Sequence, residues 1–238
     1  MDRNSNSYTF TYATVMVIVV AIALAFTAYQ LKPTINKNIA IDKKQNILTS
    51  VNVASTAANA ESLYAEKIVN SYVVNTKGEV LSTDAATAFA IDLKKEAALA
   101  KANSSYERQL PVFECNINGE TKYILPLYGA GLWGPIWGYL ALNDDMNTIY
   151  GANFAHQGET PGLGAEISTP AFQEQFKGKS IFDNDVLASI MVAKSNESYP
   201  KEHSVDAISG GTITSKGLEE MIKQDLEAYS AFLKSKKQ

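Results

Sequence analysis

The chain has a stretch of twenty residues without a charged side chain, from Tyr12 to Leu31. Twenty helical residues, at about 1.5 Å each, span the roughly 30 Å hydrocarbon core of a bilayer. A cleaved signal peptide is the alternative, but its apolar part is typically about 7 to 15 residues long and follows a basic start. Here only Arg3, next to Asp2, precedes the stretch. We therefore expect a retained transmembrane helix over residues 12–31, after a short tail at residues 1–11.

The charges that follow this segment bear on its orientation. Four lysines come soon after it, and the positive-inside rule would place the rest of the chain in the cytoplasm. These lysines are Lys32, Lys37, Lys43 and Lys44.

Composition limits the possible chemistry. The chain has 238 residues, which is enough for one good core beside a membrane segment. Its formal net charge is −4, with no long basic run, so nucleic acid is not an expected partner. The single cysteine, Cys115, cannot supply the four thiolates of an iron–sulfur cluster, and we expect it to be a packed strand residue. The two histidines, His156 and His203, do not suggest a metal site, so any redox chemistry requires an organic cofactor.

The remaining pattern predicts an α+β domain with a largely antiparallel sheet and flanking helices over residues 67–238, joined to the membrane by a linker helix at 32–66. Within the linker, the apolar spacing that indicates the helix covers residues 39–65. The other expected helices are 84–102, a helix from Pro170 that ends before Gly178, and 215–232. The expected strands are a hairpin at 71–81, a meander at 110–117, 122–128, 136–142 and 148–154, and a strand at 186–193.

The first glycine-rich motif, Gly129 to Gly134, matches the dinucleotide-binding pattern G-x-G-x-x-G. The residues after it, from Pro135 to Leu140, indicate a strand. A dinucleotide fold needs a helix there, whose amino terminus meets the pyrophosphate. We therefore interpret these glycines as a tight turn between two strands.

The second motif lacks the Gly-Lys-Ser/Thr ending of a phosphate-binding P-loop, so ATP hydrolysis is unsupported. Its glycines allow the backbone to approach a flat ligand closely, and its leucine could lie on an aromatic ring. An ordinary turn explains the spacing equally well. The motif consists of Glu159, Thr160, Pro161, Gly162, Leu163 and Gly164.

The third motif lies immediately before the last expected helix. Its paired glycines remove bulk beside a threonine hydroxyl, and a helix start offers free N–H groups to a phosphate. The alternative is a plain loop in which Ser215 caps the helix. The candidate residues are Asp206, Ser209, Gly210, Gly211, Thr212 and Thr214.

Together these motifs resemble the FMN-binding domain shared by the C subunits of the Na+-translocating NADH:quinone reductase and the G subunits of the Rnf electron-transfer complex. In that family a flavin transferase takes FMN from FAD and joins its phosphate to the threonine that ends a Ser/Thr-Gly-Ala-Thr motif preceded by aspartate. The resemblance implies Thr212 as the covalent acceptor and places Glu159 to Gly164 in a second flavin-contacting loop. Gly211 departs from the family pattern, which has alanine at this position.

The segment from Tyr128 to Gly138, with its tryptophans, is similar to the C subunits rather than to the shorter Rnf subunits. That resemblance implies an electron-transfer subunit of a sodium-exporting NADH:quinone reductase, with no catalytic residue and no stand-alone catalysis. It also implies other subunits of the complex as partners, and a periplasmic domain on a single-pass protein of the bacterial inner membrane. Two other functions fit the residues alone: a membrane-anchored ligand-binding sensor, or an assembly subunit with an inert flavin motif.

Overall fold

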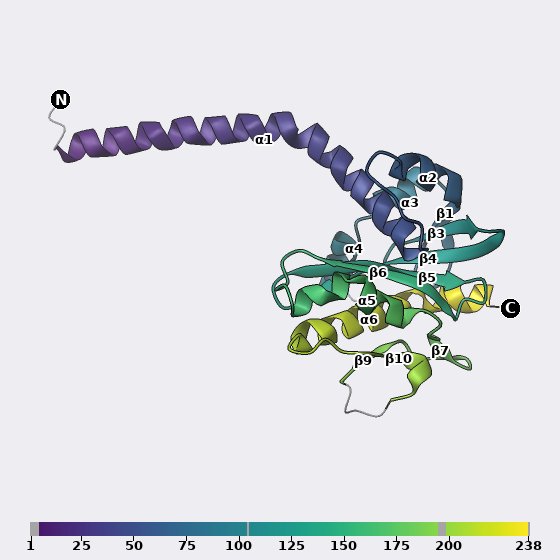
Figure 1. Cartoon of the computed structure of the whole chain (residues 1–238). Coiled ribbons are helices and arrows are strands. Elements are labelled where there is room, and N and C mark those ends of the chain that lie inside the picture. Colours follow the sequence, from purple (N-terminus) through teal and green to yellow (C-terminus); the bar gives the residue numbers. More distant parts are fainter. Residues whose placement is uncertain (1–4, 104, 195–198, 238) are drawn as a thin grey trace. The chain divides into compact units, whose positions relative to one another are not determined.

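The computed structural model describes residues 5–103, 105–194 and 199–237 (Figure 1). The chain divides into two compact units, Met1–Lys43 and Lys44–Gln238. Helix α1, Asn6–Ser50, forms the first unit and continues into the second. It is long and apolar enough to cross a membrane, because an 18-residue window has a mean hydropathy of 2.3 and none of it is buried. One helix of this kind near the N-terminus is a possible transmembrane segment.

The predicted linker helix over residues 32–66 is not continuous, and this prediction was wrong. Helix α1 runs on to Ser50 and ends there, and a separate helix, α2, spans Ala60–Lys67. The break has a local cause, since Asn52 adopts a left-handed conformation with φ of 59°. The N–H groups of Asn52 and Val53 then bond to the carbonyls of Thr49 and Leu48, which is the Schellman pattern that ends a helix.

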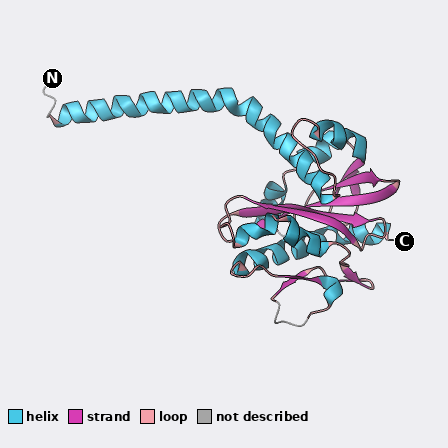
Figure 2. Ribbon diagram, in the orientation of Figure 1, coloured by secondary structure: helices cyan, strands magenta, loops and turns pink. Residues whose placement is uncertain are grey.

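The second unit is built on a six-stranded sheet in the order β2-β1-β3-β4-β5-β6, in which every neighbouring pair is antiparallel (Figure 2). This confirms the predicted α+β class, the meander and the hairpin. The turn between β3 and β4 is made by Asn118 and Gly119, both at positive φ, as tight hairpin turns favour. The strands of this sheet are β1 Ile68–Val74, β2 Val80–Ser82, β3 Leu110–Ile117, β4 Glu120–Ala130, β5 Pro135–Asn143 and β6 Ile149–His156.

The sheet has a core on each face, because successive strand residues point to opposite sides. On β4, Leu125 belongs to the larger core and its neighbour Ile124 belongs to the smaller one. The larger core is covered by α6, Thr212–Lys236. The smaller core contains Ile47 from the end of α1, together with the buried Cys115. That confirms the prediction that the cysteine is a packed strand residue.

Two other predicted elements are interrupted. The helix expected at 84–102 is two helices, α3 Ala85–Ala90 and α4 Leu93–Ala102, because Asp92 caps the second by accepting the N–H of Lys94 at 3.0 Å. The strand expected at 186–193 breaks at Ser189, whose φ is 61°. The remaining elements are α5 Pro170–Gln173, the 3-10 helices Gly164–Ser168, Glu174–Phe176 and Lys201–His203, and the short strands β7 Phe182–Asp183, β8 Val186–Leu187, β9 Met191–Ala193 and β10 Ser204–Asp206.

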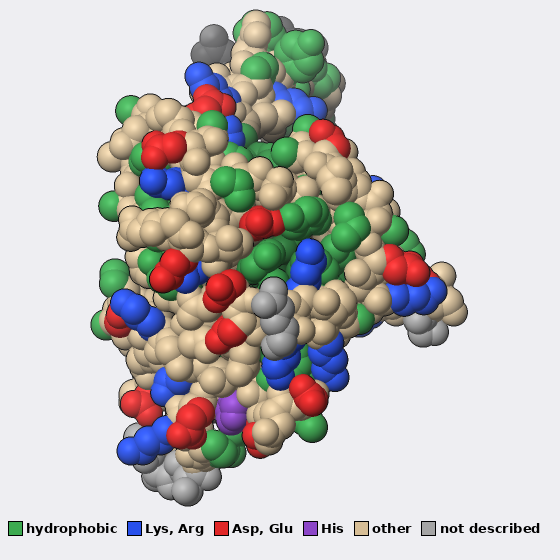
Figure 3. Space-filling model, turned by 90° about the vertical axis from the view of Figure 1, so that its right-hand side faces the viewer, with side chains coloured by type: hydrophobic (Ala, Val, Ile, Leu, Met, Phe, Trp, Pro, Cys, Tyr) green, Lys and Arg blue, Asp and Glu red, His purple; other side chains and the backbone are tan. Residues whose placement is uncertain are grey.

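Acidic and basic side chains stand next to one another over the face of the molecule shown in Figure 3. Hydrophobic side chains gather in the middle of the same face. Charges of both signs are therefore mixed on this face, without a field of one sign that would attract a highly charged polymer.

Candidate functional site

Helix α6 begins at Thr212, three residues earlier than the sequence predicted, with Gly211 as its N-cap. Among the described residues, no side chain caps this helix start. Thr212 is exposed, and it lines two cavities. The structure therefore places the candidate hydroxyl at the open amino end of a 25-residue helix, where N–H groups and the helix dipole favour an anion.

The first cavity, of about 350 Å³, brings together the motifs that lie far apart in the sequence. Leu163 and Thr160 come from the second motif, and Thr212 comes from the third. Leu132 and Trp133, in the loop between β4 and β5, complete the walls. Sequence reasoning missed these two residues because it interpreted their motif only as a turn, although a tryptophan in a glycine turn was an available signal.

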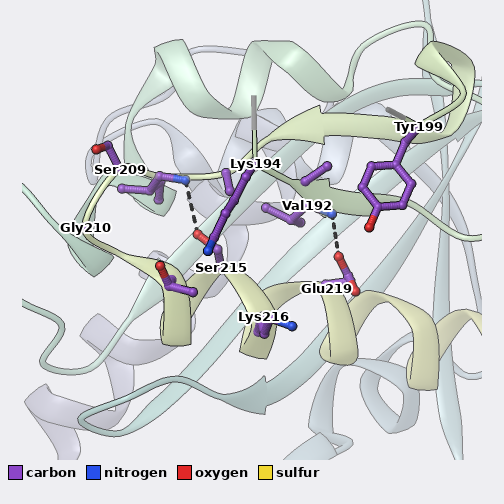
Figure 4. Close-up of a pocket in the computed structure, with 12 residues that line it drawn as sticks. Val192, Lys194, Tyr199, Ser209, Gly210, Ser215, Lys216 and Glu219 are labelled. Atoms are coloured by element: carbon purple, nitrogen blue, oxygen red, sulfur yellow. Dashed lines mark hydrogen bonds between the residues drawn. The ribbon is translucent and has the colours of Figure 1, made fainter. Parts of the chain in front are cut away.

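The second cavity, of about 400 Å³, has a more polar lining (Figure 4). Lys194 and Lys216 line it together with Ser209 and Thr212. Lys216 follows Thr212 by four residues on α6, which places the two on one face of the helix. The sequence motifs did not point to either lysine. The opposite charge in the lining, Glu219, accepts the backbone N–H of Val192 at 2.7 Å.

The structure separates the rival hydroxyl groups of the third motif. Thr214 is only 2% exposed, and its Oγ1 donates to Glu159 Oε2 at 2.5 Å. Ser215 is buried inside the helix, where its Oγ accepts the N–H of Ile208 at 3.2 Å, so the alternative in which it caps the helix does not hold. Ser209 and Thr212 remain exposed.

The glycines of the third motif are explained by close packing. Gly210 has a φ of 75°, and a side-chain carbon built on it would lie 2.6 Å from Leu163 Cδ2. A carbon on Gly211 would lie 3.0 Å from Ile208 Cγ2, so the family's alanine would require Ile208 to shift slightly. Gly211 thus suits the packing of this loop.

Three of the predicted site residues are not in the lining of either cavity: Asp206, Pro161 and Gly162. Asp206 ends β10, where its N–H donates to Gln175 Oε1 at 2.8 Å. Gly162 has a φ of 73° and open space around it, so the protein needs glycine there for its backbone conformation. Within the described ranges, no group of three His, Cys, Asp or Glu side chains could hold a metal ion.

A family model described as FMN-binding domain matches residues 131–227, which include the residues that line both cavities. The fold and the site therefore define an FMN-binding domain. A curated relative from Haemophilus ducreyi, named as the C subunit of the Na(+)-translocating NADH-quinone reductase, is 33% identical over 210 residues, or 84% of this chain and 81% of the relative. A relative of the same name from Neisseria meningitidis serogroup B is 34% identical over 205 residues, or 79% and 77% of the two chains.

Two solved structures share the fold. The C subunit from Parabacteroides distasonis is 48% identical with a TM-score of 0.77, covering 85% of this chain and 96% of that one. NqrC from Shewanella oneidensis is 26% identical with a TM-score of 0.68, covering 84% and 99%. The chain belongs to the family of C subunits of the Na+-translocating NADH-quinone reductase. This confirms the resemblance to the C subunits, which are named as parts of an oxidoreductase complex.

Proposed function

We propose that this chain is the electron-transfer subunit of a Na+-translocating NADH:quinone reductase and carries FMN on Thr212 through a phosphoester. Electrons from NADH pass through this subunit toward quinone, coupled to sodium export. The observation that carries the proposal is the position of Thr212, which is exposed at the start of α6 and lines both cavities. The other subunits of the complex are its partners.

The residues around Thr212 fit such a group. The uncapped start of α6 offers N–H donors to a phosphate, and Lys194 and Lys216 add positive charge to the cavity beside it. The apolar side chains of Trp133 and Leu163 suit contact with a flat ring. They would keep water away from the side of the ring that they cover. When bound, the flavin supplies reversible one- or two-electron chemistry, while these residues supply position and shielding.

The linkage requires a flavin transferase with FAD as donor. The bond from Thr212 Oγ to the FMN phosphorus forms, the pyrophosphate bond of FAD breaks, and AMP leaves. The hydroxyl proton passes to a general base of the transferase. Thr214 is a poor acceptor because its hydroxyl is buried and already bonded to Glu159.

Coexpression with the transferase tests the acceptor. Wild type and Thr214→Ala should give a fluorescent band on a denaturing gel, whereas Thr212→Ala should give none and Thr212→Ser a weak one or none. Peptide mass spectrometry locates the added FMN mass. Full flavinylation of Thr212→Ala, with the mass on Ser209 or another residue, would show that the acceptor was assigned wrongly.

We also propose that α1 crosses the inner membrane once and that the domain after Leu31 is periplasmic. The family resemblance supports this side, and the lysines after the apolar segment favour the other. Protease added to intact spheroplasts should cut the domain. Protection until lysis would place it in the cytoplasm.

A further inference from the structure

Glu159 is a buried carboxylate that joins three separate segments of the chain. It is only 4% exposed. Its Oε1 accepts the backbone N–H of Trp133 at 2.8 Å, and its Oε2 accepts the hydroxyl of Thr214 at 2.5 Å. The carboxylate therefore connects its own loop, after β6, to the loop between β4 and β5 and to the first turn of α6.

Two glycines leave the space that this carboxylate occupies. A side-chain carbon on Gly131 would lie 2.5 Å from Glu159 Oε1, and one on Gly164 would overlap both Oε2 and the hydroxyl of Thr214. These glycines belong to two different motifs. In the structure they make room for the Glu159 side chain. A glycine is therefore needed at both positions for packing within the protein.

The three joined segments are also the walls of the cavity of about 350 Å³. Trp133 is 69% exposed, and its neighbour Leu132 is exposed as well, so burial of these side chains does not hold their loop. Its described restraints include the bond from Trp133 to Glu159 and a backbone bond from Gly131 N to Gly134 O at 2.8 Å. Hydrogen bonds to a carboxylate are stronger than those between neutral groups.

We propose that Glu159 is the positioning residue of the flavin site: through Trp133 and Thr214 it fixes the walls of the cavity and thereby holds the ring still. The claim that Glu159 holds the flavin ring rests on the proposed function. The claim that Glu159 fixes the loop of Trp133 concerns the protein alone. Glutamine should replace it well, because the amide oxygen can accept from Trp133 while the amide nitrogen donates to Thr214 Oγ1. Alanine makes neither bond.

The first experiment needs no flavin. Trp137 is the other tryptophan of the chain, so Trp137→Phe leaves Trp133 as the only indole emitter. In the full-length, flavin-free protein with this background, Glu159→Ala should lower the fluorescence anisotropy of Trp133, and Glu159→Gln should keep it. Circular dichroism and melting curves show that each variant is folded. Unchanged anisotropy in Glu159→Ala, or an equal loss in Glu159→Gln, would overturn the role of the two bonds.

The second experiment measures the anisotropy of the attached flavin, counting only protein with FMN mass on Thr212. Thr214→Val keeps the shape of threonine and loses the bond to Glu159, whereas Thr214→Ser keeps a hydroxyl and is the matched control. The flavin should be more mobile in Glu159→Ala and Thr214→Val than in wild type, Glu159→Gln and Thr214→Ser. A flavin equally rigid in all variants would overturn the inference. A wild-type chain without FMN on Thr212 would instead refute the proposed function, and the Trp133 data would still decide the loop part.

Discussion

The two faces of the sheet are packed with the same kinds of apolar residue, yet they contact different helices. On one face α6 buries Leu218 and Tyr229 against the larger core, and the first turn of the same helix carries Thr212. On the other face the smaller core holds Ile47, from the end of α1. The start of α6 and the end of α1 therefore depend on separate packing, so we expect that each can be perturbed alone.

The largest expected effect is on the larger core. Asp225 is 2% exposed, accepts the guanidinium of Arg108 at 2.8 Å and the N–H of Tyr128 at 2.7 Å, and so ties α6 to the end of β4. Asp225→Ala takes these partners from a guanidinium that is 11% exposed and from a partly buried N–H, which should lower the free energy of unfolding by about 3–5 kcal/mol. Urea denaturation of the full chain in detergent measures this loss.

Asp225→Asn is the matched control for that experiment. Its amide oxygen can still accept one of the two bonds, so it should lose less stability than the alanine variant. If the two variants lost equal stability, or if Asp225→Ala lost under about 1 kcal/mol, the buried pair would not be the link between α6 and the sheet.

A pair of cavity-forming variants should separate the two faces. Ile47→Ala and Leu218→Ala each remove a fully buried side chain and should each cost about 2–5 kcal/mol. Leu218 lies one turn after Thr214, so its loss should also make the attached flavin more mobile. Ile47→Ala should leave flavin anisotropy unchanged while it is folded. An equal effect of both variants on the flavin would show that the two cores are coupled.

The smallest expected effect distinguishes a strained backbone from an obstructed ligand. Gly162 and Gly119 both have positive φ, 73° and 90°, and open space where a side chain would begin. Valine at either position should cost about 1–2 kcal/mol of strain. Only Gly162→Val should change the loading or the spectrum of the flavin, because Gly119 lies in the turn between β3 and β4. If both or neither changed it, the loop around Gly162 would be a plain turn.

Several elements could be predicted because they depend on residues close together in the sequence. The apolar run near the N-terminus, the alternation along β3 to β6 and the Asn118-Gly119 turn are local patterns, and the structure contains the corresponding helix, strands and turn. Where prediction failed, a single residue ended an element within an otherwise continuous pattern. Asn52, Asp92 and Ser189 do this through a left-handed backbone or a cap, which periodicity of apolar residues does not reveal.

Three features could be predicted without the structure because each depends on neighbouring residues: an apolar helix long enough to span a bilayer, an antiparallel domain, and a threonine beside paired glycines. The accessible hydroxyl and the contacts of Glu159 could be read only from the folded structure. Thr212 and Thr214 are two residues apart and chemically alike, but one is exposed and the other is bonded to a carboxylate 55 positions away. Burial and hydrogen bonding between distant segments arise only when the sheet and α6 bring those segments together, because they depend on distances that the linear order of residues does not fix.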